Sequence, residues 1–450
     1  TCFDEVIIVA NANSETTGAT PSTDGSEYTA SLVYGSGTSF GGSGYVVYKG
    51  TTSPQTVTGL TNGLTYYFTF YSRKGTEWVK SLTANCTPVA SVAGDYRSAT
   101  TGSWETLATW LRYNGSSWNT PTSGQGVPIY NTSQRVSIMS GHTITLASTR
   151  SIDQFTINAG GQLTINATRT LTIANASDAI DCNVNGTIYN LGTLTPTGVI
   201  SFNSGSVYNH ARDGGTIPTA TWNSASTCLI TGFNTTSGNQ GANGFNQTFG
   251  NFTWNCASQG SEIHLGGVMT SITGNLTITS TGSSNFSLGL NQAGNLAVGG
   301  DFLQTNGTFY VSGNASTNNG TARTITVTGN FDLSGGNLYL TNTNTSNAVI
   351  YVKGNYTHTG GNISESGNST GSGINFNGTG TAQLYTGGAS AANVTNNVNY
   401  TVSSPAFLQM GYETTDFIPG GASVAFTINS GAKLGVTSAA GITTSGATGN

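Results

Sequence analysis

The sequence predicts an all-β protein in which a β-sandwich is followed by a parallel β-solenoid. A phrase of glycine, asparagine or aspartate, and an apolar residue recurs along the second half of the chain, and short alternating β-branched and aromatic runs separate its copies. The 450 residues include 63 glycines without a Gly-X-Y period, which excludes collagen, and only 7% of the residues are charged. With 36% hydrophobic residues, a core can form if each small coil shares it with the next.

The first segment, predicted as a domain over residues 1–92, carries the pattern of a sandwich corner. In "VTGLTNGLTYYFTFYSRKG", residues 57–75, Leu60, Gly63 and Tyr66 stand at the spacing Leu-x-x-Gly-x-x-Tyr. This stretch resembles the corner between strands E and F of a fibronectin type III domain. The resemblance implies that the Tyr66 hydroxyl bonds back to the corner backbone.

The stretch "DEVIIVANANSETTGATPSTDGSEYTA", residues 4–30, resembles the third strand and the following loop of the same domain in surface proteins of Bacteroidota, the gliding and biofilm-forming bacteria. Only three residues precede it, so the first two strands of the sandwich are missing. Either the chain is part of a longer one, or another segment completes the sheet. We therefore expect one face to be partly exposed, namely Phe3, Val6, Ile8, Tyr66, Phe68 and Phe70.

Residues 93–140 form the predicted lead-in and cap of the solenoid. "YRSATTGSWETLATW", residues 96–110, and "RVSIMSGHTITL", residues 135–146, resemble the lead-in of β-solenoids in very large exported proteins. Because a solenoid end exposes strand edges and apolar side chains, we expect Trp104, Trp110 and Trp118 to cover the first coil.

The recurrent phrase predicts a right-handed parallel β-solenoid over residues 141–450 that continues beyond the chain end. The phrase begins with glycines at successive spacings of 24, 26, 29 and 25 residues, namely Gly250, Gly274, Gly300, Gly329 and Gly354. We expect Gly-Asn and Gly-Gly to supply the positive φ angles that bend the chain between strands. About a dozen coils at roughly 4.8 Å each predict a rod of about 60 Å. One column should contain Phe252, Phe302, Phe331 and Tyr356.

Charge and cysteine usage restrict the partners. Residues 1–150 hold 8 basic and 8 acidic residues, while residues 151–450 hold 5 and 10, so the net charge of −5 belongs to the second part. Such a surface offers no basic footprint for nucleic acid, and no apolar run is long enough to span a membrane. The cysteines lack zinc spacing, and we predict no metal and no cofactor. Cys2 and Cys86 bracket the first domain as a candidate disulfide, whereas any two of Cys182, Cys228 and Cys256 could bridge coils.

Catalytic residues are not predicted. The densest polar cluster is His210-Ala211-Arg212-Asp213, with Asp178 and Asp181 a coil earlier, and we interpret it as a polar loop rather than an acid–base pair. His142, His264 and His358 are expected to face solvent. An alternative is a flat threonine ladder that binds carbohydrate or ice, formed by Thr277, Thr279, Thr324, Thr326 and Thr328.

Most of the chain resembles large exported cell-surface adhesins of Bacteroidota, which are substrates of the type IX secretion system. The resemblance implies a non-enzymatic stalk or adhesin segment on the extracellular face of the outer membrane, with a role in adhesion or gliding motility. The implied partners are the type IX secretion machinery, outer-membrane surface components, surface glycans and further copies of the protein. The alternative is a carbohydrate-binding or polysaccharide-degrading β-helix protein.

Overall fold

In the computed structural model the chain divides into two compact units, Thr1–Val92 and Ala93–Asn450. Apart from the 3-10 turn η1 (Leu107–Thr109), all regular elements in the described part of the chain are β-strands. The structure describes residues 3–22, 24–52, 55–131, 133–176, 179–289, 294–313, 322–341, 347–365, 371–387, 392–411, 416–418, 425–437 and 442–444.

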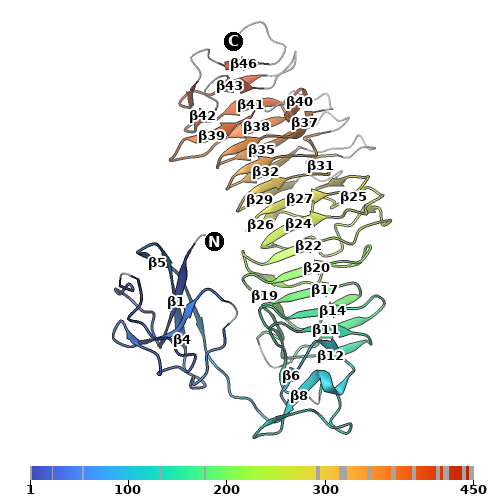
Figure 1. Ribbon diagram of the computed structural model, residues 1–450. Coiled ribbons are helices and arrows are strands. Elements are labelled where there is room, and N and C mark those ends of the chain that lie inside the picture. Colours follow the sequence, from blue (N-terminus) through green and yellow to red (C-terminus); the bar gives the residue numbers. More distant parts are fainter. Residues whose placement is uncertain are drawn as a thin grey trace. The chain divides into compact units, whose positions relative to one another are not determined.

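The first unit is built on one antiparallel sheet, which we call the N-terminal sheet (Figure 1). Its order is β2-β3-β1-β4-β5, so strands distant in sequence are neighbours at its centre. The five strands are β1 (Glu5–Ala12), β2 (Ser39–Phe40), β3 (Gly44–Gly50), β4 (Tyr66–Lys74) and β5 (Glu77–Cys86).

The two faces of the N-terminal sheet differ in burial. On one face Ile7, Val9 and Tyr71 are fully buried, and the segment between β1 and β2 covers them: the Tyr71 hydroxyl donates to the Ala19 carbonyl at 3.0 Å. On the other face the side chains are only half-buried, which agrees with the expected partial exposure; they are Phe3, Val6, Ile8, Phe68 and Phe70. Tyr66 corrects that expectation, since it is 1% exposed.

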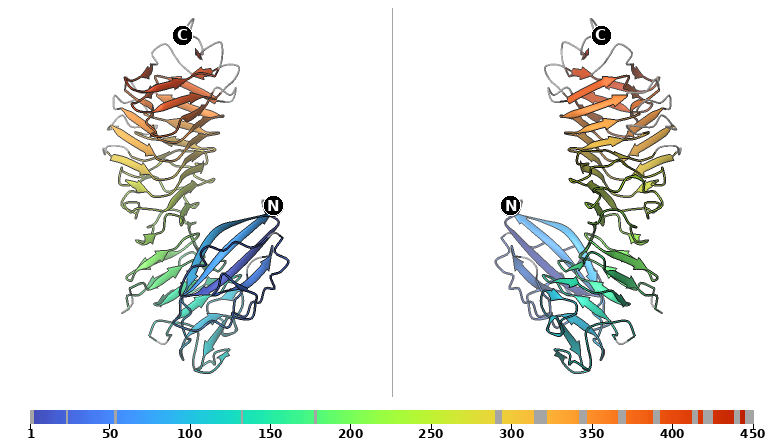
Figure 2. Two further views of the ribbon diagram at one scale, coloured as in Figure 1. Left: turned by 90° about the vertical axis from the view of Figure 1, so that its left-hand side faces the viewer. Right: turned by 90° about the vertical axis from the view of Figure 1, so that its right-hand side faces the viewer.

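The second unit is a parallel β-solenoid, in which successive coils stack along one axis (Figures 1 and 2). A 14-stranded sheet, the long sheet, runs through it, and at roughly 4.8 Å per strand it is about 60 Å long. Its strands are β7 (Gly102–Ser103), β11 (Thr143–Leu146), β14 (Gln162–Ile165), β17 (Thr187–Asn190), β20 (Val207–His210), β22 (Thr227–Ile230), β24 (Asn251–Asn255), β27 (Leu276–Ser280), β30 (Phe302–Gln304), β33 (Phe331–Leu333), β36 (Tyr356–His358), β39 (Gln383–Thr386), β42 (Phe407–Met410) and β45 (Lys433–Gly435).

Two side sheets complete the early coils. Side sheet 1 contains β6 (Tyr96–Ser98), β10 (Val136–Ile138), β13 (Phe155–Ile157), β16 (Cys182–Val184), β19 (Ile200–Phe202) and β21 (Thr221–Trp222), extended by β8 (Trp110–Tyr113) and β9 (Trp118–Asn119). Side sheet 2 contains β12 (Arg150–Ile152), β15 (Thr170–Ile173) and β18 (Thr193–Pro196).

Two other side sheets replace them in the late coils. Side sheet 3 contains β23 (Gly238–Asn239), β25 (Ile263–His264), β28 (Phe286–Ser287), β31 (Thr308–Tyr310), β34 (Asn337–Tyr339), β37 (Gly361–Glu365) and β40 (Ala392–Asn396). Side sheet 4 contains β26 (Ser271–Ile272), β29 (Gly294–Val298), β32 (Arg323–Val327), β35 (Ala348–Val352), β38 (Gly373–Phe376), β41 (Asn399–Val402) and β44 (Phe426–Ile428). β43 (Asp416–Ile418) pairs with β46 (Ile442–Thr444).

The parallel stack begins inside the segment predicted as lead-in. β6 and β7 pair in parallel with β10 and β11, so the first coil starts at Tyr96. β8 then pairs antiparallel with the outer edge of β6, and β9 with β8, which covers the edge of side sheet 1. Trp104 and Trp110 are fully buried with ring centres 4.9 Å apart, while Trp118 is half-buried and lies against Arg97.

One hydrophobic cluster fills the solenoid from Tyr96 to Met410. The register confirms the predicted column, because Phe252, Leu276, Phe302, Phe331 and Tyr356 are successive partners along the long sheet. The ring centres of Phe302 and Phe331 are 4.9 Å apart, and those of Phe331 and Tyr356 are 5.1 Å apart, both stacked. Each coil therefore buries its apolar side chains against the same positions of its neighbours.

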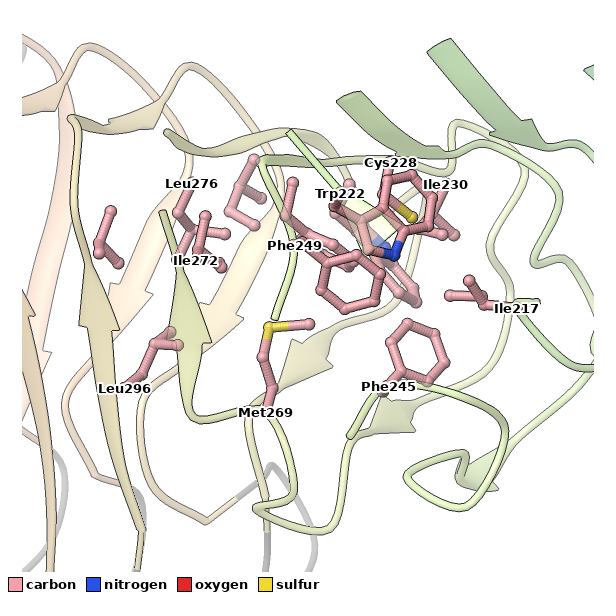
Figure 3. Packing of buried hydrophobic residues seen from close by; sticks show 14 of the residues in the cluster. Ile217, Trp222, Cys228, Ile230, Phe245, Phe249, Met269, Ile272, Leu276 and Leu296 are labelled. Atoms are coloured by element: carbon pink, nitrogen blue, oxygen red, sulfur yellow. The ribbon is translucent and has the colours of Figure 1, made fainter. Parts of the chain in front are cut away.

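Aromatic packing fills the core where the side sheets change. Side sheet 1 ends at Trp222 and side sheet 4 starts at Ser271, while the long sheet continues without a break through β22 and β24. Figure 3 shows Trp222, Phe249 and Phe245 packed together there, with Met269 close by. The Trp222 and Phe249 ring centres lie 5.3 Å apart, so large rings occupy the space that the changing sheets leave.

Candidate functional site

The charged cluster that the sequence singles out becomes a set of clamps between coils. Arg212 Nη1 donates to the Gly192 carbonyl at 2.5 Å and to the Thr193 hydroxyl at 2.7 Å, both in the preceding coil. The Asp213 carboxylate accepts hydrogen bonds from the N–H groups of residues 234–236 in the following coil. Arg212 thus binds the preceding coil, and Asp213 binds the main chain of the following coil.

The carboxylates of this region are engaged as acceptors of main-chain N–H groups. Burial disfavours the charged form of Asp213, yet the Thr235 hydroxyl and the surrounding N–H groups outweigh it and hold the pKa of Asp213 well below its usual value. The buried Asp181 accepts from the N–H groups of Ala176 at 2.8 Å and Val199 at 2.7 Å. Asp178 lies outside the described residues. This geometry stabilises loops, in line with the interpretation of the cluster as a polar loop.

His210 belongs to a buried polar chain in the core rather than to the loop. Its Nε2 donates to the Gly214 carbonyl at 2.9 Å, so its Nδ1 accepts from the Tyr208 hydroxyl at 3.1 Å, and that hydroxyl accepts from Asn190 Nδ2 at 2.9 Å. Burial lowers the pKa of His210 to about 4, despite the Gly214 bond, so the ring is neutral at pH 7. The sequence analysis did not predict these hydrogen bonds, although the two-residue spacing of Tyr208 and His210 places both side chains on one face of the strand.

Two further histidines are buried, which corrects the expectation that they face solvent. His358 stands two residues after Tyr356 on β36 and shares its inward face; its Nε2 lies 3.3 Å from the Gly361 carbonyl. Burial lowers the pKa of His358 to about 4 and also lowers the pKa of His264, which is 9% exposed. His142 is half-buried, with Nδ1 2.8 Å from the Ser98 hydroxyl.

The recurrent glycines form a ladder in which main chains of successive coils approach closely. The Gly300 N–H donates to the Gly274 carbonyl at 2.8 Å, and the Gly329 N–H donates to the Gly300 carbonyl at 2.9 Å. Gly250 and Gly354 continue the same ladder. None of the five has a positive φ, so the expectation that they bend the chain through the left-handed region is wrong. Their role is close packing: a Cβ on Gly300 would lie 2.1 Å from Asn275 Oδ1.

The residue after each glycine forms a second, side-chain ladder. Asn275 Oδ1 accepts from the Asp301 N–H at 2.8 Å, Asp301 Oδ1 from Asn330 at 2.6 Å, and Asn330 Oδ1 from Asn355 at 2.9 Å. Asn251 precedes this series and bonds the Asn275 N–H in the same way. A carbonyl or carboxylate oxygen is needed at this position, which explains why the phrase accepts either asparagine or aspartate there.

The predicted corner of the first unit has the expected hydrogen bond. The Tyr66 hydroxyl accepts from the Thr61 N–H at 3.0 Å. Gly63 adopts a φ of +80°, and its N–H donates to the Pro88 carbonyl at 2.8 Å. Leu60 is half-buried and faces a groove on the open side of the sheet.

That groove has a volume of about 640 Å³. Its floor consists of side chains from β1, β3 and β4, and Thr51, Thr52, residues 55–57 and Leu60 form one wall. The lining residues are Phe3, Val6, Ile8, Tyr48, Gly50, Thr51, Thr52, Gln55, Thr56, Val57, Leu60, Phe68, Phe70 and Cys86.

The cysteines of the solenoid do not bridge coils. Cys182, Cys228 and Cys256 are buried free thiols, and burial raises the pKa of each, that of Cys256 to about 12. Cys86 is exposed, whereas Cys2 lies outside the described residues, so their pairing stays a prediction.

The proposed threonine ladder is divided between two sheets. Thr277 and Thr279 lie on β27 of the long sheet, whereas Thr324 and Thr326 lie on β32 of side sheet 4. Thr326 has Ala297 and Tyr351 as its neighbours on the adjacent strands, so it does not continue a threonine row. These residues therefore do not form one flat face.

Within the described residues, no group of three or more His, Cys, Asp or Glu side chains could hold a metal ion. None of their helices is long and apolar enough to cross a membrane. In comparisons with known proteins, no family model, no curated protein and no solved structure matches the chain.

Proposed function

We propose that the chain is a stalk segment of an exported cell-surface adhesin, of the type that Bacteroidota export through the type IX secretion system. The observation that carries the proposal is the continuous ladder of the long sheet. Between Gly250 and Asn355 the glycine main chains and the Asn or Asp side chains join successive coils, while the aromatic column fills the interior there. Such a stack resists local opening and holds attached modules away from a surface.

The distribution of charge supports a structural role over a catalytic one. Arg212, Asp213 and Asp181 bind main chain of neighbouring coils, and His210 is neutral inside the core. The remaining surface is rich in threonine, serine and asparagine, which suits contact with glycans, outer-membrane components or further copies of the protein. The secretion machinery would be the partner during export.

Deleting whole coils in the native host tests this function. Removal of residues 302–355 joins Asp301 to Tyr356 and preserves the phrase, because Gly354-Asn355-Tyr356 is equivalent to Gly300-Asp301-Phe302. A stalk should stay folded, reach the cell surface and retain adhesion at reduced reach. Loss of adhesion by a folded, surface-exposed deletion protein would contradict the stalk role, as would a native protein that external protease cannot reach on intact cells.

A second candidate function, saccharide binding, is favoured by a notch on side sheet 4. The notch has a volume of about 230 Å³, and the half-buried Tyr351, Asn375 and Thr401 line it beside Gly373. Among the residues that the structure describes, Asn375 Oδ1 has no hydrogen-bond partner and is buried there. An aromatic ring beside uncharged amide and hydroxyl groups suits a neutral sugar.

Titration of the full chain with neutral oligosaccharides, followed by NMR, tests this candidate. Binding that Tyr351→Ala abolishes and Tyr189→Ala retains would support it, since Tyr189 is a half-buried tyrosine on the outer face of the long sheet. Equal loss in both variants, or no binding at all, would refute it.

A further inference from the structure

The open face of the N-terminal sheet carries an apolar groove, which a stalk does not require. Tyr48, Ile8 and Phe70 are direct partners across β3, β1 and β4, and all three are half-buried on the floor of the groove. On the opposite face of the same sheet, Ile7, Val9 and Tyr71 are buried under the segment between β1 and β2. A sheet with one sealed face and one apolar groove of about 640 Å³ is suited to receive a further layer.

The lining of the groove restricts the chemistry of its occupant. None of the described residues that line it carries a charge: the floor is aliphatic and aromatic, and the wall is formed by Thr51, Thr52, Gln55, Thr56 and Val57. A charged group placed over Ile8 and Phe70 would lose its hydration without gaining a partner. The occupant must therefore be uncharged where it meets the floor.

The wall adds a hydrogen-bonding edge. The Thr58 N–H donates to the Leu32 carbonyl at 2.7 Å, and the Thr58 carbonyl accepts from the Tyr34 N–H at 2.8 Å. Because main-chain groups alternate in direction along an extended segment, the N–H and carbonyl of Val57 point to the opposite edge. Val57 itself lines the groove. An apolar floor thus lies beside a segment whose second edge can pair with another strand.

We propose that this groove binds an extended, uncharged β-strand of a partner polypeptide with apolar side chains at alternate positions. Its main chain pairs with the edge at Val57, and every second side chain points down onto Ile8, Phe68 and Phe70. A second copy of the same concave face could not fill the groove, because both faces would present hollows. The first unit then acts as a docking module joined to the stalk.

A synthetic peptide tests the proposal on the full chain. The probe is a seven-residue peptide with blocked ends that alternates valine and threonine; the control has the same composition with its valines contiguous. We expect the alternating peptide to bind roughly tenfold more tightly in calorimetry, as the loss of one anchoring contact implies. It should slow hydrogen exchange in residues 55–60 and, in protein reduced beforehand, slow alkylation of the Cys86 thiol, which lines the groove and is exposed.

Paired variants separate docking from folding. Ile8→Thr should lower the affinity for the alternating peptide by roughly tenfold. Val79→Thr should leave the affinity for this peptide unchanged, because Val79 is 61% exposed and lies outside the groove. Unchanged circular dichroism in both variants shows that the sheet is intact. If Ile8→Thr misfolds, the affinities of the two peptides and the alkylation rate of Cys86 in the unmodified chain decide the question. Equal binding of both peptides, exchange protection elsewhere, or a dimer that occupies the groove would overturn the proposal.

Discussion

The N-terminal sheet and the solenoid use similar strands but close them differently. In the solenoid Phe302, Phe331 and Tyr356 are 0% exposed, because the other sheets of each coil enclose them and the neighbouring coils stack on them. In the N-terminal sheet Phe68 and Phe70 stay half-buried, although they alternate on β4 in the same way. A repeat therefore supplies its own second layer, whereas a single sheet needs one from elsewhere.

The largest difference between the two regions should follow from removing one phenylalanine from each. Phe302→Ala opens a cavity in the sealed column and should lower the free energy of unfolding by about 3–5 kcal/mol. Phe70→Ala removes a half-buried ring over the groove and should lower it by about 1 kcal/mol. Urea denaturation of the full chain measures both. Equal losses would show that the two faces are closed to the same extent.

Acid should weaken the solenoid before it weakens the first unit. All four histidines lie after residue 92, and His210 and His358 have pKa values lowered to about 4 by burial. The unfolded chain, with histidine pKa values near 6.5, then binds more protons than the folded one, so stability is present above pH 6.5 and is lost as the pH falls toward 4. Each histidine should remove about 2 kcal/mol at pH 5.

Denaturation curves between pH 7 and pH 5 measure this dependence. His210→Gln combined with His358→Gln should lower the slope of the unfolding free energy against pH in that range by the equivalent of about one to two protons. A slope that the double variant retains would mean that other groups cause the acid sensitivity.

Close packing of coils can be tested at one glycine. Gly300→Ala places a Cβ against Asn275 Oδ1 and the Gly274 main chain, and the shift it forces should cost about 1–3 kcal/mol. Gly124→Ala is the matched control, since Gly124 is exposed, lies in the same unit, and has no atom within 4 Å of an added Cβ. Thermal melts that show the same shift for both variants would contradict the ladder.

The side-chain ladder should give the smallest effect. Asn355→Ala removes the acceptor of the Leu384 N–H and should cost about 1 kcal/mol. Asn355→Asp keeps an acceptor oxygen, as Asp301 does in the same ladder, and should cost less. Equal stability of the alanine and aspartate variants would show that the hydrogen bond does not contribute.

Local patterns predicted the solenoid because its contacts repeat in sequence. The phrase beginning at Gly329 identifies the column through Phe331, since equivalent residues of stacked coils must meet. The reason for the glycine itself was not predictable, because φ angles and close approach leave the same sequence signature. His358 is buried because it stands two residues after Tyr356 on the same strand and shares its inward face. The sequence analysis assigned it to the surface because histidine is polar.

The sequence pattern could not predict which strands share a sheet or which distant segments pair. Thr277 and Thr324 belong to similar alternating runs, and only the fold assigns them to different sheets. The partial exposure of Ile8 and Phe70 was expected from the sequence, but the edge at Val57 depends on pairing of Thr58 with the distant Leu32 and Tyr34. Such pairing leaves no local signal.

Hydroxyl-radical footprinting of the full chain tests most directly the claim that one region is sealed and the other open. Oxidation of aromatic side chains, located by mass spectrometry, should be rapid at Phe68 and Phe70 and slow at Phe302 and Phe331, with the buried Tyr66 of the same strand β4 as an internal control. We expect faster oxidation of both groove rings than of the column rings. Equal protection of Phe70 and Phe331 in the isolated chain would contradict it.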